Sequence, residues 1–146
     1  MIPVFQRIID VGKGDCFKCC LASIFEQEYD NIPNFIEFKK SYMDETASQW
    51  LSTFGYKILR LDLRDQNSIY QIEWMLASGI YCILSVDSQK YPGGAHAVVG
   101  QFIRNKNEYS LEVVHDPNPD NMKYKDFDKD FKIHSIRFFI STHPKL

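Results

Sequence analysis

Three side chains suited to nucleophilic catalysis follow one another in the order cysteine, histidine, aspartate. Cys16 stands at the expected start of a helix, His96 at the expected start of a strand, and Asp116 directly after the next strand. A thiolate can attack a carbonyl carbon when a histidine handles its proton and a carboxylate orients that histidine. The order and placement therefore predict a Cys16–His96–Asp116 triad.

The position of Cys16 favours a reactive sulfur. A helix N-terminus carries unpaired N–H groups and partial positive charge, and both favour a thiolate over a thiol. The backbone N–H of Cys16 is also a candidate donor to the oxyanion of a tetrahedral intermediate. Gln6 is the only Gln or Asn ahead of Cys16, and its amide is the candidate second donor.

The link between His96 and Asp116 depends on the hairpin turn that joins their strands. A three-residue turn at 105–107 would place the two residues directly opposite each other, with Cβ atoms about 5 Å apart. A two-residue turn at 105–106 would place His96 opposite His115 unless a bulge intervened. The triad therefore predicts a turn of odd length or a bulge.

Apolar periodicity predicts the elements that hold these residues. Spacings of three and four indicate a helix from about residue 16 to about residue 27, with Asp15 as N-cap, Cys20 facing the core and Cys19 off the apolar stripe. Other helices are expected around 35–38, over Ala47–Phe54 before Gly55, and at about 67–78; strands are expected at 56–63, 80–86, 95–103, 108–115 and 133–140, and a loop at 116–130.

The order of these elements indicates the fold class. Helices come first and mostly antiparallel strands follow, which predicts one α+β domain over residues 1–146 with the helices packed against one sheet. The run 80–86 is apolar without interruption, so this strand is expected at the centre of the sheet.

Composition limits the class of protein and of partner. The 146 residues are 45% hydrophobic and 25% charged, which is ordinary for a globular domain with a sizeable core. The net charge of −2 without a Lys/Arg block argues against a nucleic-acid partner. No apolar run approaches the roughly 18 residues that span a membrane. The N-terminus lacks the pattern of an export signal, so a cytoplasmic location and free thiols are expected.

The same residues also allow plainer interpretations. Asp116 could be a turn former, with Asn118 as the alternative orienter, and His115 is expected to be structural. Cys16 and Cys19 have the spacing of two metal ligands, but no second pair accompanies them, so no metal or cofactor is expected. His134 and His143 show no partner pattern and receive no role.

The segments Gly14-Asp15-Cys16, Gly94-Ala95-His96-Ala97-Val98 and His115-Asp116-Pro117 resemble the papain-like cysteine peptidase superfamily. The resemblance is to its compact bacterial and phage members, including the peptidases that process bacteriocins after a double glycine, and it runs from about Gln6 to about Pro119. It implies a papain-like fold and cleavage of a peptide or isopeptide bond, or acyl transfer, without a metal. It also implies Cys16 as nucleophile, His96 as base, Asp116 as orienter and Gln6 as oxyanion donor.

We therefore expect a cysteine peptidase or related amide-bond hydrolase that acts on a peptide or protein through an acyl-enzyme. Two alternatives stay open. An amine could resolve the acyl-enzyme instead of water, which would make the protein an acyltransferase. The same fold could also be a non-catalytic binding module, such as a phage protein that engages a host factor, with Tyr42, Tyr91 and Tyr124 as contact residues.

Overall fold

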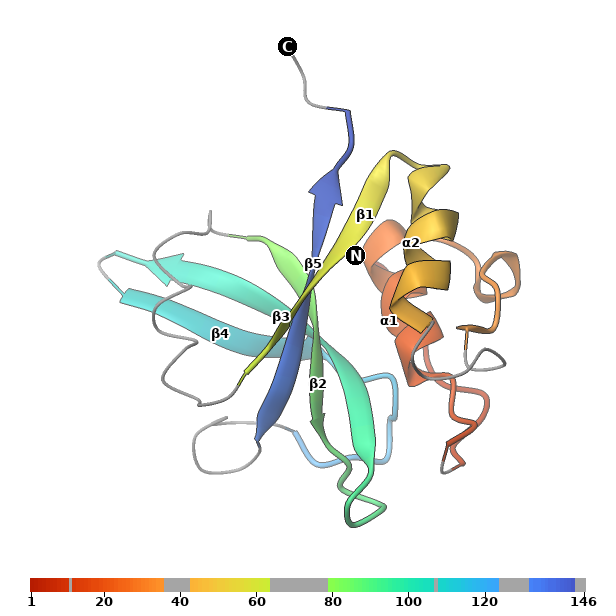
Figure 1. Cartoon of the computed structure of the whole chain (residues 1–146). Helices are drawn as coiled ribbons and strands as arrows, with labels where there is room; N and C mark the ends of the chain where they lie inside the picture. The colour runs from red at the N-terminus through yellow and green to blue at the C-terminus, as the bar shows by residue number, and fades with distance from the viewer. Residues whose placement is uncertain (11, 36–42, 64–78, 107, 124–131, 144–146) are drawn as a thin grey trace.

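The fold is α+β, as the order of elements predicted. The computed structural model describes residues 1–10, 12–35, 43–63, 79–106, 108–123 and 132–143 (Figure 1). These residues form α1 (Cys16–Phe25), a 3-10 turn η1 (Tyr29–Asn31), α2 (Met43–Ser52), β1 (Tyr56–Asp62), β2 (Tyr81–Asp87), β3 (Ala95–Asn105), β4 (Glu108–His115) and β5 (Ile133–Ser141). The expected helix at 67–78, residues 36–38 of the expected short helix and the end of the 116–130 loop lie outside the described residues.

The described strands form one sheet in the order β1-β5-β2-β3-β4, and every neighbouring pair is antiparallel. The central position of β2 confirms the prediction made from its continuous apolar run. Ile83 packs into the cluster that the helices share, whereas Leu84 packs into a cluster on the other face, so β2 is buried on both sides. α1 contacts β3 and β2, and α2 contacts β1 (Figure 1).

The N-terminal segment, residues 1–10, covers the side of α1 that lies off the apolar stripe. The backbone N–H of Ile2 donates to the Ser23 carbonyl at 3.2 Å, and that of Val4 donates to the Ser23 hydroxyl at 2.9 Å. Cys20 is fully buried in the core as expected, but Cys19 is fully buried too. The expected off-stripe position of Cys19 therefore does not mean exposure, because this segment adds a second covered face to the helix.

The β3–β4 hairpin contains a bulge, but its turn and register differ from those that would make His96 and Asp116 a directly opposed pair. Asn105 pairs with Glu108, so the turn between them has two residues rather than three. The register then shifts between Val99 and Gly100, which is the site of the bulge. A bulge of this kind changes which residues face each other beyond it.

The bulge does not make His96 and Asp116 a directly opposed pair. The last pair of the ladder is Val99 with His115, so Asp116 lies beyond the end of β4. The expectation of direct opposition is wrong. The Asp116 side chain instead returns to β3 from the segment that follows the strand.

In the part of the chain that the structure describes, there is no helix with the length and apolar character needed to cross a membrane.

Candidate active site

α1 begins at Cys16, and Asp15 occupies the N-cap position as predicted. Its carboxylate, however, does not cap α1. It accepts hydrogen bonds from the backbone N–H groups of Arg7 at 3.1 Å and Ile8 at 3.3 Å, and from the Tyr29 hydroxyl. Asp15 therefore holds the N-terminal segment against α1, and its carboxylate leaves the N–H groups of the first helical turn to other acceptors.

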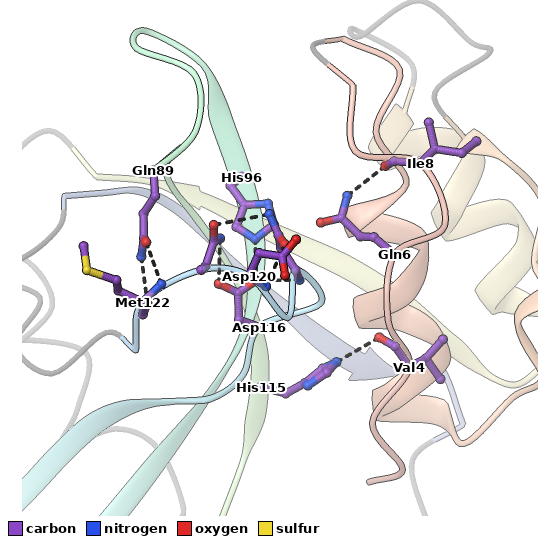
Figure 2. Close-up of polar contacts among 11 residues, drawn as sticks. Val4, Gln6, Ile8, Gln89, His96, His115, Asp116, Asp120 and Met122 are labelled. Atoms are coloured by element: carbon purple, nitrogen blue, oxygen red, sulfur yellow. Dashed lines mark hydrogen bonds and ion pairs between the residues drawn. The ribbon is translucent and has the colours of Figure 1, made fainter.

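His96 and Asp116 form a hydrogen-bonded pair (Figure 2). The Nε2 atom of His96 lies 2.6 Å from Oδ1 of Asp116, and the two side chains are only 9% and 16% exposed. β4 ends at His115, and the Asp116 carboxylate just beyond it lies at the beginning of β3, where His96 is the second residue. A buried carboxylate in this position fixes both the orientation and the tautomer of the imidazole.

Cys16 completes the chain of contacts. Cys16 lies near enough to His96 to influence the titration of its ring, together with Asp116. Burial by itself would lower the pKa of His96, but its hydrogen bonds and charge interactions with Asp116 and Cys16 raise that pKa to about 9. The imidazole is therefore held as a cation at neutral pH.

The other three cysteines are less exposed to solvent than Cys16. Cys16 is half-buried, whereas Cys19, Cys20 and Cys82 are fully buried. Burial raises the pKa of Cys19 to about 12 and raises the pKa values of Cys20 and Cys82 well above the usual thiol range. Thiolate chemistry in this chain is thus confined to Cys16.

Gln6 contacts the segment that follows Asp116 and the residues just before Cys16. Its backbone N–H donates to the Pro117 carbonyl at 2.9 Å, and its side-chain Nε2 donates to the Ile8 carbonyl at 3.1 Å (Figure 2). A Cβ atom added to Gly14 would lie 3.4 Å from the same Nε2, so the amide also sits close to the residues just before Cys16. The Oε1 atom of the same amide is buried and has no hydrogen-bond partner among the described residues.

Sequence reasoning missed the residues that hold Asp116. The backbone N–H of Asn118 donates to Oδ1 of Asp116 at 2.9 Å, and the Asn121 amide donates to Oδ2 at 2.9 Å. Asn118, the alternative orienter, thus contacts Asp116 and not the His96 ring that it was expected to orient. The run Asp-Pro-Asn-Pro-Asp-Asn signals a tight turn, but it does not reveal which acceptor each amide reaches.

The remaining histidines differ in their contacts. His115 bonds through Nε2 to the Val4 carbonyl at 2.9 Å, which fits its expected structural role. His134, which showed no partner pattern in the sequence, in fact pairs with Asp87 at 2.6 Å on the surface. No group of three His, Cys, Asp or Glu side chains is placed to hold a metal ion within the described ranges.

A thiol near an imidazole that is hydrogen-bonded to a carboxylate, beside helical N–H groups without a side-chain cap, can generate a nucleophile and stabilise an oxyanion. No family model, curated protein or solved structure matches the chain.

Proposed function

We propose that this protein is a papain-like cysteine peptidase or a related amide-bond hydrolase that acts on a peptide or protein. The observation that carries the proposal is the hydrogen-bonded pair of His96 and Asp116, with Cys16 at the start of α1 near enough to raise the pKa of His96 along with Asp116. The three residues come from the start of α1, the start of β3 and the segment after β4, so local sequence alone does not bring them together. Such a convergence of nucleophile, base and orienter is typical of acyl-transfer sites.

The reaction follows from the contacts. His96 takes up the Cys16 proton, and the sulfur attacks the carbonyl carbon while that carbonyl's π electrons move to its oxygen. The Cys16 backbone N–H and the Gln6 amide stabilise the resulting oxyanion. His96 then gives its proton to the leaving amine as the C–N bond breaks, and an acyl-enzyme remains. His96 next accepts a proton from the water that hydrolyses this thioester.

The direction of the Asp15 carboxylate supports this assignment. An aspartate at an N-cap ordinarily bonds to N–H groups of the first helical turn. Here the carboxylate is committed to Arg7, Ile8 and Tyr29, so it does not compete with a substrate oxygen at the helix N-terminus. The same bonds hold Gln6, the residue before Arg7, next to the site.

Alkylation of the folded protein tests the nucleophile directly. We expect iodoacetamide to modify Cys16 well before Cys19, Cys20 or Cys82, because only the Cys16 sulfur is both accessible and paired with His96. Mass spectrometry of peptides from timed samples measures the four rates. In His96→Gln the rate at Cys16 should fall about tenfold or more near pH 7, since the thiolate loses its cationic partner.

Turnover of a peptide library, followed by mass spectrometry, tests the reaction. Cys16→Ala should remain folded and lose at least about 10³-fold in kcat/KM. As a second measurement, a vinyl-sulfone probe should form a covalent bond with Cys16 in the unmodified chain. The hydrolase proposal fails if Cys16 alkylates at the rate of an ordinary thiol, or if peptide turnover survives Cys16→Ala unchanged.

A further inference from the structure

Both oxygens of the Asp116 carboxylate are occupied. Oδ1 accepts from the Asn118 backbone N–H at 2.9 Å in addition to its contact with His96, and Oδ2 accepts from the Asn121 side-chain amide at 2.9 Å. The terminal torsion of an aspartate is broad, so a single bond to the imidazole would leave the carboxylate plane free to rotate. Donors on both oxygens remove that freedom.

The Asn121 amide is itself held in one orientation. Its Oδ1 accepts from Nδ2 of Asn118 at 3.2 Å, and its backbone N–H donates to the Asn118 carbonyl at 3.2 Å. With Oδ1 engaged as an acceptor, Nδ2 is the atom that must point at Asp116. The amide therefore acts as a donor toward the carboxylate with no ambiguity of orientation.

A second tie joins this segment to the loop that leads into His96. Nε2 of Gln89 donates to the Met122 carbonyl at 2.9 Å, and Oε1 of Gln89 accepts from the Met122 backbone N–H at 2.9 Å (Figure 2). The side chain of Gln89 thus bonds to the backbone N–H and carbonyl of Met122 as a neighbouring strand would, at a point beyond the end of the β3–β4 ladder. It fixes the residue next to Asn121 relative to the loop between β2 and β3.

We propose that Asn121 is a positioning residue, whose side-chain amide fixes the Asp116 carboxylate on the imidazole of His96. Its effect on turnover rests on the proposed hydrolase function, whereas its effect on the imidazole does not. Asn121 bonds to neither Cys16 nor His96 in the structure, and it acts through Asp116 alone.

The experiment compares Asn121→Ala with Asn105→Ala, a matched change at an exposed position at the end of β3. NMR titration of the His96 ring should give a pKa about one unit lower in Asn121→Ala and unchanged in Asn105→Ala, because a loosened carboxylate stabilises the imidazolium less. The rate of Cys16 alkylation near pH 7 should fall in Asn121→Ala and stay unchanged in Asn105→Ala, because less imidazolium remains beside the sulfur. Turnover should fall about tenfold in kcat with little change in KM, the size found when groups that orient a functional side chain are removed.

Asn118→Ala provides an independent arm if Asn121→Ala does not fold. It removes the Nδ2 donor that aims Asn121 but retains the backbone N–H that binds Asp116, so a smaller shift of the same sign is expected. The proposal is overturned if the titration of His96 and the alkylation rate are unchanged in whichever of these variants is folded. A chain that shows these shifts but cleaves no peptide would reject the hydrolase function and keep the positioning role.

Discussion

His96 connects the chemistry of the site to the stability of the protein. Two effects act on the imidazole in opposite directions: burial disfavours its cation, and the interactions with Asp116 and Cys16 favour it. The second effect is larger, and the pKa rises to about 9 from the ordinary value near 6.5. A histidine that is cationic in the folded chain but half-neutral in the unfolded chain at pH 6.5 must make folding depend on pH.

The sign of that dependence follows from the raised pKa. The stabilisation by His96 is fully present below about pH 6.5 and is lost as pH rises through about 9. Urea unfolding of the unmodified chain and of His96→Gln between pH 6 and pH 10 should therefore give a difference in unfolding free energy that shrinks by about 1–3 kcal/mol. A difference that stays constant across this range would contradict the assigned cationic state.

For the proposed hydrolase, the same titration should limit turnover at high pH. The form with a cationic His96 beside Cys16 is lost above about pH 9, so the alkaline limb of kcat/KM should report the His96 value. This limb is the one that should move in Asn121→Ala.

The N-terminal segment and α1 form the element on which the nucleophile depends. α1 is enclosed by the sheet on one side and by this segment on the other, which is why both Cys19 and Cys20 are buried. Asp15 is the main polar link between the two, since it is almost fully buried and receives three hydrogen bonds. The loop before β3 adds another link through the Tyr91 hydroxyl, which donates to the Ile9 carbonyl at 3.0 Å.

Removal of the Asp15 carboxylate should therefore destabilise the chain. Asp15→Ala leaves the N–H groups of Arg7 and Ile8 and the Tyr29 hydroxyl without their acceptor, and the unfolding free energy should fall by about 2–4 kcal/mol. Asp15→Asn should cost nearly as much, because one carboxylate oxygen becomes an N–H that faces donors. Denaturant titration measures both variants, with Tyr29→Phe as the milder control at about 1 kcal/mol. Equal stability of Asp15→Ala and the unmodified chain would rule out this role.

The elements show what the sequence could and could not predict. Helix α1, the central strand β2 and the β3–β4 hairpin follow from periodicity within each segment, and so does the placement of Cys16 and His96 at their ends. The burial of Cys19 could not be predicted in this way, because it depends on the N-terminal segment, which has no periodic pattern. The direction of the Asp15 carboxylate and the target of Asn121 likewise depend on backbone groups that only the folded chain brings near.

In the whole molecule, Arg137 joins the helical layer to the sheet. Its side chain on β5 is only 6% exposed, and Nε donates to Oδ1 of Asp44 on α2 at 2.6 Å. The guanidinium also lies 5.3 Å from the ring centre of Phe17 on α1. The Arg137 guanidinium on the sheet therefore contacts both helices. Because it is buried, leaving it without a carboxylate partner would lower the free energy of unfolding.

Asp44→Ala should be far more harmful than its position at the edge of the helical layer suggests. The change leaves the Arg137 charge buried without its carboxylate, and the unfolding free energy should fall by about 3 kcal/mol or more. Glu45→Ala is the matched control, since it removes an exposed acid from the same helical turn. Arg137→Met should cost less than Asp44→Ala because it removes the buried charge itself. Equal effects of Asp44→Ala and Glu45→Ala in thermal unfolding would refute this account.

The contacts of the N-terminal segment also determine when the site can exist during folding. Val4 meets His115 across 111 positions of sequence, and Ile9 meets Tyr91 across 82. Contacts between such distant residues close large loops and form late, whereas the hairpin that carries His96 is local and forms early. Cys16 therefore precedes residues 115–117 by about a hundred positions, and the site is not assembled until the segment ahead of Cys16 has docked on them. For the proposed hydrolase this means that activity would be acquired only at the end of folding, so the partly folded chain would be silent.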